Sequence, residues 1–205
     1  MAKHHCTVGK ADEEYQSMKI LLLDNYDSFT YNLVHYIEQV AGHQPEVFRN
    51  DEISIEAIKE YDKIMLSPGA GLPADAGIMP QLIKEYYKTK SIFGVCLGQQ
   101  AIAEAFGGSL SNLNEVFHGV ATPITIIKED YLFKNVPSTF KVGRYHSWVV
   151  NPKDLPSDLE ITAIDEQGNC MALHHKTYDI RGVQFHPESI LSEFGLDIIR
   201  NWVEH

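Results

Sequence analysis

The sequence predicts an α/β fold: a doubly wound, mainly parallel central sheet flanked by helices, with a strand-rich second half. First, short apolar runs alternate with helix-like segments from residue 19 to residue 106, which is the pattern of βαβ units. Second, three of these runs end in polar turns, at the sheet edge where such folds bind ligands. Third, five more strand-like runs follow, and no linker divides the chain.

The first half alternates strands and helices at short intervals. Strands are expected at residues 19–23, 45–48, 63–66 and 92–95. Helices are expected around residues 33–40, 53–61, 77–87 and 101–106. The first helix has apolar residues at offsets of three, four and seven, and Gly42 follows it as a stop signal. Ser54 is a candidate cap for the second, and Gly107-Gly108 closes the last.

The second half is richer in strand-like runs. They are expected at residues 122–127, 138–142, 159–164, 170–174 and 180–185. A chain of 205 residues fits one domain, which we place at residues 18–205. Residues 1–17 show neither apolar periodicity nor the apolar region of a secretory signal. We therefore expect a disordered leader, or an arm, at this end.

Composition excludes some classes of partner. The net charge is −11 and the chain has no basic cluster, which argues against nucleic acid or an anionic membrane as a partner. The three cysteines, Cys6, Cys96 and Cys170, are too few and too widely spaced for a disulfide framework. They fit a reducing compartment, so we expect a cytoplasmic protein. His4-His5-Cys6 lacks a fourth ligand at a sensible spacing, so no metal site is expected.

Cys96 is the strongest candidate for a catalytic group. It stands between a short apolar run and a helix-like segment, with Gly94 and Gly98 two residues away on either side. This is the spacing of a nucleophile elbow, a sharp turn that needs small neighbours and lifts the nucleophile to the carboxyl edge of the sheet. The helix N-terminus there favours a thiolate. The alternative is a buried core cysteine, and the glycine frame favours the nucleophile.

A base for this thiol is available in His186. It follows the last predicted strand, and Pro187 fixes the backbone between it and Glu188. Residues i and i+2 around a rigid proline can point the same way, so Glu188 can orient one imidazole nitrogen while the other faces Cys96. The alternative, a strand-end histidine beside a solvated glutamate, remains open from sequence.

The segment from Ser67 to Pro73 is too rich in proline and glycine for regular structure. Its glycines allow close approach of the backbone, so an N–H from this loop and one from Leu97 could bind an oxyanion. An ordinary turn between strand and helix explains the loop equally well.

Together these motifs resemble the class I, or triad, glutamine amidotransferases, in particular the small subunits of anthranilate and aminodeoxychorismate (para-aminobenzoate) synthases. The resemblance covers residues 18–204. The segments that carry it are 22–30, 67–71, 94–100, 145–147 and 185–189.

The resemblance implies a reaction and a set of site residues. Cys96 would attack the side-chain amide of L-glutamine, with His186 as base and Glu188 as its orienting group, and Gly69 and Leu97 would hold the oxyanion. Glutamine would bind at Gly69, Ala70, Gly71, Gln100, Ser147 and Trp148. The ammonia would pass to a chorismate-binding large subunit. No cofactor is implied in this chain, and Mg²⁺ is expected on that partner.

Four positions depart from the family pattern. Ala70 replaces a proline, Gln99 stands where histidine is common, Val120 where lysine is expected, and Trp148 where an aliphatic residue is usual. Two other functions remain open: a stand-alone γ-glutamyl hydrolase with the same elbow, and a non-catalytic regulatory module of the same fold. The intact set of Cys96, His186 and Glu188 argues against the second.

Overall fold

A computed structural model describes residues 18–205 of the chain, so the predicted leader at residues 1–17 lies outside the described residues. The large sheet contains β1 (Ile20–Asn25), β2 (Glu46–Arg49), β3 (Lys63–Gly69), β4 (Ser91–Val95), β6 (Val120–Ile126), β7 (Thr139–Arg144), β9 (Leu159–Asp165), β10 (Cys170–His175) and β11 (Ile180–Val183). A small second sheet pairs β5 (Leu110–Asn112) with β8 (Trp148–Val150). The α-helices are α2 (Thr30–Ala41), α3 (Met79–Tyr86), α4 (Leu97–Ala105) and α5 (Gly195–Glu204). Short 3₁₀ helices are η1 (Ile55–Glu60), η2 (Pro73–Asp75), η3 (Tyr131–Phe133) and η4 (Pro152–Asp154).

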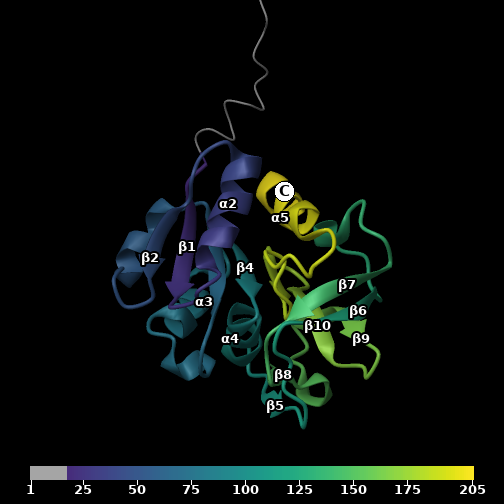
Figure 1. The fold of residues 1–205 in the computed structure, drawn as a ribbon. Helices are drawn as coiled ribbons and strands as arrows, with labels where there is room; N and C mark the ends of the chain where they lie inside the picture. The colour runs from purple at the N-terminus through teal and green to yellow at the C-terminus, as the bar shows by residue number, and fades with distance from the viewer. Residues whose placement is uncertain (1–17) are drawn as a thin grey trace, which may run out of the picture.

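The large sheet has the order β2-β1-β3-β4-β11-β10-β9-β6-β7. The strands from β2 to β11 run parallel, and those from β10 to β7 are antiparallel to their neighbours. Figure 1 shows the two parts side by side, with the parallel strands β1, β2 and β4 in purple to teal and the antiparallel strands β6, β7, β9 and β10 in green to yellow-green. The α/β class and the strand-rich second half are confirmed.

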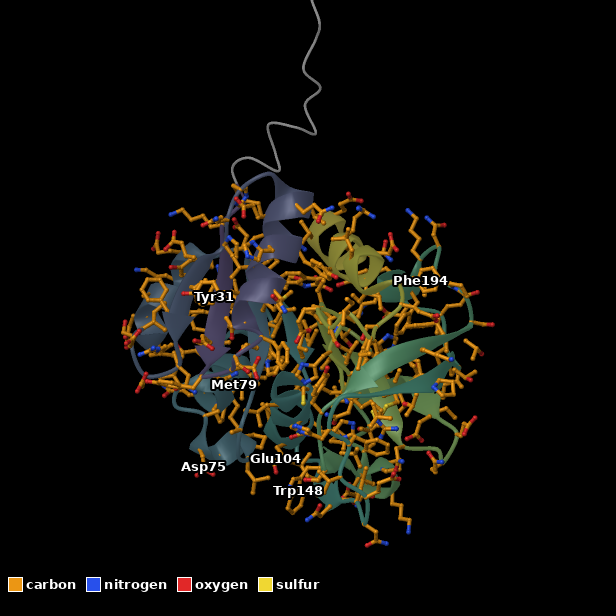
Figure 2. All side chains as sticks on the ribbon, viewed as in Figure 1. Tyr31, Asp75, Met79, Glu104, Trp148 and Phe194 are labelled. Carbon is orange, nitrogen blue, oxygen red and sulfur yellow. The ribbon has the colours of Figure 1, made fainter. Side chains whose placement is uncertain are left out.

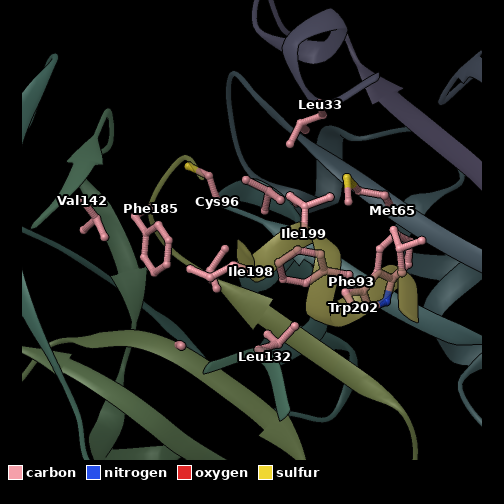
Figure 3. Packing of buried hydrophobic residues seen from close by; sticks show 14 of the residues in the cluster. Leu33, Met65, Phe93, Cys96, Leu132, Val142, Phe185, Ile198, Ile199 and Trp202 are labelled. Carbon is pink, nitrogen blue, oxygen red and sulfur yellow. The ribbon is translucent and has the colours of Figure 1, made fainter. Parts of the chain in front are cut away.

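Two apolar layers cover the two faces of the sheet. Successive residues of β1 alternate between them, because side chains of a strand point to opposite faces. One layer contains the apolar residues of α2 and α5, and the other those of α3 and α4. Figure 3 shows part of the first layer, where Ile198, Ile199 and Trp202 of α5 pack near Phe93 of β4. Burial on both faces explains why these strands read as continuous apolar runs.

The expected starts and stops of several elements are present. Gly42 ends α2 with a left-handed φ of 76°, and its N–H donates to the carbonyl of Glu38. Ser54 caps η1 by accepting from the N–H of Ala57. This element is a 3₁₀ helix of six residues and not a longer α-helix.

The structure corrects three expectations. The loop from Ser67 to Pro73 begins as strand, because β3 continues through Gly69 and pairs there with Asn25. The strand expected at residues 180–185 ends at Val183, which is the last residue of β11 that pairs with β4. Helix α5 and the small β5–β8 sheet were not predicted. The apolar spacing of α5 at Ile198, Ile199, Trp202 and Val203 is helical and could have revealed it.

The carboxyl ends of the parallel strands meet at one edge of the sheet. The turn after β1, the loop after β3 and Cys96 after β4 therefore lie at this edge, as predicted. Among residues 18–205, no helix is long and apolar enough to cross a membrane.

Candidate active site

Cys96 occupies the sharp turn between β4 and α4. Its backbone has φ 52° and ψ −101°, a left-handed conformation that is unfavourable for a residue with a side chain. The N–H of Cys96 donates to the carbonyl of Val183 at 2.8 Å, and its carbonyl accepts from the N–H of Gln100 at 3.1 Å. These two bonds hold the strained residue between β11 and the first turn of α4.

Gly94 and Gly98 make this turn possible. A Cβ on Gly94 would lie 2.4 Å from the carbonyl carbon of Gly98, and one on Gly98 would lie 2.7 Å from the carbonyl oxygen of Leu66. Both distances are below any normal contact, so the backbones of β4, α4 and β3 pack directly on one another here. The predicted nucleophile elbow is present.

His186 and Glu188 form the predicted pair. The imidazole Nδ1 lies 2.7 Å from Glu188 Oε1, and both side chains are buried. A carboxylate can only accept, so Nδ1 carries a proton in both the neutral and the charged ring, and Nε2 is the atom that gains or loses a proton. Among the described residues Nε2 has no hydrogen-bond partner. Backbone pairing with Gly143 of β7 fixes the position of His186.

The environment of His186 favours its charged form. Burial lowers the pKa of His186, but the neighbouring Cys96 and Glu188 outweigh burial and raise the pKa to about 10. Cys96 and His186 are thus close enough to interact, although Nε2 and the sulfur do not form a hydrogen bond in this structure. The rings of Phe29 and Tyr145 meet the imidazole edge-on, at centroid distances of 6.0 and 4.9 Å.

Beside Cys96 lies a cavity of about 310 Å³. This volume lies in the range of small-molecule sites, roughly 300–1,000 Å³. Every residue predicted to bind glutamine or the oxyanion lines this cavity, namely Gly69, Ala70, Gly71, Leu97, Gln100, Ser147 and Trp148. Figure 2 shows Trp148 at the same end of the molecule as Asp75, which follows the Gly69–Leu72 loop.

Sequence reasoning missed the role of a buried polar residue in the wall of the cavity. His146 lines the cavity and accepts at Nε2 from Arg144 Nε, at 3.0 Å, while Nδ1 donates to the carbonyl of Trp148 at 3.0 Å. Burial and the Arg144 charge lower the pKa of His146 to about 3, so this ring is neutral at physiological pH. Arg144 is in turn paired with Asp165 at 2.9 Å and lies over the ring of Phe117.

A second missed residue, Gln184, contacts the nucleophile. Its Nε2 lies 3.5 Å from Cys96 Sγ, and its Oε1 accepts from Gln100 Nε2 at 3.2 Å. Gln184 precedes His186 by two residues, in the bend that follows β11. No local pattern in the sequence marks it, because its contact with Cys96 depends on how the folded segments meet.

The four departures from the family pattern fall in different places. Ala70 and Trp148 line the cavity, so both can alter how it binds its ligand. Gln99 is buried away from the cavity, with its amide near Cys170. Val120 is exposed at the start of β6, outside the cavity.

Comparison with known proteins identifies the family. The chain matches the family model for glutamine amidotransferase class-I over residues 21–205. This chain is a class-I glutamine amidotransferase. The match confirms the predicted family and with it the predicted glutamine-hydrolysing class of enzyme.

Relatives of this amidotransferase include components of two related synthases. It is 43% identical over 187 residues to the aminodeoxychorismate/anthranilate synthase component 2 of Bacillus subtilis, covering 90% of this chain and 95% of that one. It is also 43% identical to the anthranilate synthase component 2 of Pyropia yezoensis, covering 91% and 99%. A solved structure from Thermoplasma acidophilum, provisionally described as a GMP synthase subunit, has a TM-score of 0.81 and 27% identity, covering 91% and 92%.

Proposed function

We propose that this amidotransferase is the glutaminase component of a chorismate-aminating enzyme. It hydrolyses L-glutamine to glutamate and ammonia and delivers the ammonia to a chorismate-binding large subunit. That partner is the first component of anthranilate synthase, in tryptophan biosynthesis, or of aminodeoxychorismate synthase, in folate biosynthesis. The observation that carries the glutaminase function is the position of Cys96, which lies at the wall of the cavity and beside the paired His186 and Glu188.

The proposed chemistry uses only side chains of this chain. Cys96 gives its thiol proton to His186 Nε2, and its sulfur attacks the side-chain carbonyl carbon of glutamine. The N–H groups of Gly69 and Leu97 bind the oxyanion. The C–N bond then breaks, and His186 donates the proton to the leaving ammonia. Water, deprotonated by His186, hydrolyses the resulting thioester to glutamate and restores the thiol.

Glu188 serves this sequence by holding the imidazole. Its contact with Nδ1 fixes the ring orientation and stabilises the imidazolium that forms after proton transfer. Thiol, imidazole and carboxylate supply nucleophile, base and orienting group, so the chemistry needs no metal or organic cofactor in this chain. In this proposal Mg²⁺ binds to the chorismate-binding partner. Both subunits are located in the cytoplasm.

Two observations support a chorismate-binding partner. The relatives at 43% identity are synthase components of this kind, whereas the structural neighbour described as a GMP synthase subunit is 27% identical. In addition, large apolar side chains are exposed close in sequence to site residues: Tyr26 lies in the turn after β1, and Ile190 comes two residues after Glu188. Ile190 is 98% exposed. Large exposed apolar side chains are typical of surfaces that dock a partner.

Glutamate release from L-glutamine tests the proposal. The purified chain is assayed alone and then with each candidate chorismate-binding partner, chorismate and Mg²⁺, with Cys96→Ser as the control. Cys96-dependent release that rises with one partner supports the proposal, and the aromatic product names the pathway. Release that no partner changes, together with turnover of extended γ-glutamyl substrates, would favour a stand-alone hydrolase. A folded chain that releases no glutamate with any partner would favour a regulatory module.

A further inference from the structure

The sulfur of Cys96 has a polar neighbour besides His186. Gln184 Nε2 lies 3.5 Å from Sγ, within the range of an N–H···S hydrogen bond, and the Gln184 side chain is fully buried. Gln184 and His186 lie two residues apart in the bend that follows β11, and this segment brings both an amide and a base close to the same sulfur.

Neighbouring groups fix which end of the Gln184 amide faces Cys96. The carbonyl of Trp148 can only accept, so the Gln100 atom 2.9 Å from it is the donor Nε2. The same Nε2 lies 3.2 Å from Gln184, which must therefore present its acceptor, Oε1. The Nε2 of Gln184 is left pointing at the sulfur. The backbone carbonyl of Trp148 thus sets the donor direction along a chain of hydrogen bonds that runs through Gln100 and Gln184 to the sulfur of Cys96.

A donor in this position restricts the proton of the thiol. An amide N–H cannot accept a hydrogen bond, so the S–H of Cys96 cannot point toward Gln184 Nε2. The sulfur lone pair faces Gln184, so the thiol hydrogen points away from this amide. When the His186 ring is neutral, its Nε2, which has no other partner among the described residues, is an acceptor for that hydrogen. After the proton has moved to His186, the same N–H donates to an anionic sulfur, where a hydrogen bond is about twice as strong as between neutral groups.

We propose that Gln184 is a catalytic residue of the glutaminase reaction, whose amide N–H directs the Cys96 proton toward His186 and then stabilises the thiolate. This inference rests on the proposed glutaminase function. The proposal also gives Gln100 a second role, in addition to the glutamine binding that the family resemblance implies for it. Its Nε2 bonds to Trp148 and Gln184, so Gln100 positions Gln184 as well.

The chain offers a matched control for this contact. Gln99, next to Gln100 in α4, is equally buried, and its Nε2 lies 3.9 Å from the sulfur of Cys170. Gln184→Met and Gln99→Met each replace a buried amide beside a cysteine with an apolar side chain of similar length. Only the first removes a donor from the proposed nucleophile.

The test measures alkylation of Cys96 by iodoacetamide between pH 5 and pH 10, with peptide mass spectrometry to separate the cysteines. In Gln184→Met we expect the midpoint of the pH profile at Cys96 to move up by about one pH unit, since hydrogen bonds to charged groups are the stronger ones. In the assembled complex, kcat for glutamine hydrolysis should fall about tenfold with KM little changed. Gln99→Met should leave both values at wild type.

A second variant protects the test against misfolding. Gln184→Asn keeps a polar side chain but is too short to reach the sulfur, so it should give the same shift if Gln184→Met does not fold. A wild-type profile in a folded Gln184 variant would overturn the role of Gln184. Labelling of the wild-type chain by a chloroketone analogue of glutamine is the control for the proposed function. If Cys96 resists that reagent in the complex, the proposed function fails, and this inference fails with it.

Discussion

The two buried cysteines of the described chain differ in almost everything except burial. Cys96 lies in a strained turn, with an imidazole on one side, an amide donor on another and a cavity in front. Cys170 begins β10 in ordinary extended structure and is fully buried within the second apolar layer. Burial raises the pKa of the Cys170 thiol far above its usual value, because a thiolate there would lose its solvation.

Both cysteines have a glutamine amide nearby, so an amide alone does not make a nucleophile. What Cys170 lacks is a base and an opening to solvent. The difference between the two sites shows that reactivity comes from the turn that exposes the sulfur and from the charged pair beside it.

The largest expected effect separates the two thiols by function. Cys96→Ala should lower glutamine-dependent amination by about 10⁴-fold or more, the scale of nucleophile loss in other triad enzymes. Ammonia-dependent amination by the partner should persist. Cys170→Ala should change glutamine turnover less than about twofold and lower the free energy of unfolding by about 1 kcal/mol through a small cavity. Equal losses of activity in the two variants would contradict the distinction.

Chemical labelling sharpens the same contrast without a partner chain. Iodoacetamide should modify Cys96 in the native chain at least about 10³-fold faster than Cys170, since reagent reaches Cys170 only through openings that cost several kcal/mol. The measurement is the time course of modification of each cysteine-containing peptide at pH 8. In about 6 M urea the two rates should converge. Comparable rates in the folded protein would mean that Cys170 is also accessible.

Removing the charge of Glu188 should weaken the Cys96 site and leave Cys170 unchanged. Glu188→Gln keeps the shape of the side chain but no longer stabilises the imidazolium. We expect kcat in the complex to fall by about 10²–10³-fold, within the range of positioned acid–base groups. The raised pKa of His186 should fall at the same time, which NMR titration of the imidazole protons can detect. If the pKa of His186 does not change in this variant, Glu188 is not a cause of the raised pKa.

The strained turn itself can be tested at Gly94. Gly94→Ala places a Cβ 2.4 Å from the carbonyl carbon of Gly98, so the elbow must open. We expect a loss of about 2–3 kcal/mol in the free energy of unfolding, measured by urea titration, together with slower labelling of Cys96. Gly107→Ala, at the other end of α4, is the matched control. A Cβ there meets nothing within 4 Å, so only the strain of φ 97° should appear, about 1–2 kcal/mol. Equal costs for the two variants would argue against a closely packed elbow.

The smallest effect concerns His146, the neutral histidine in the wall of the cavity. The pKa of His146 is lowered from 6.5 to about 3 in the folded chain. As the pH falls from 7 to 5, the unfolded chain takes up a proton here and the folded chain does not, so stability falls by about 2 kcal/mol. In urea titrations, the free energy of unfolding of His146→Gln should lack this part of its pH dependence. The contribution of His186 to that pH dependence is the same in the variant and in the wild type, so it cancels in the comparison. Parallel pH curves for variant and wild type would mean that His146 is protonated in the folded state.

The sequence alone predicted the parts of the site that depend on local rules. The glycine frame around Cys96 predicted the elbow, because only glycines allow the backbone contacts found at Gly94 and Gly98. Pro187 predicted that His186 and Glu188 point the same way, and their contact of 2.7 Å agrees. The α/β class followed from apolar periodicity, which reports which faces of a strand or helix are buried.

Other features depend on groups that meet only after folding. Gln184 reaches Cys96 because β11 lies beside β4, a pairing between segments 88 residues apart. His146 is neutral because Arg144 and a buried environment surround it, and neither effect can be read from the spacing of residues. The sequence therefore determined which chemical groups the site contains. Only the tertiary structure decided their protonation, their donor directions and the cavity they share, because these depend on distance and burial.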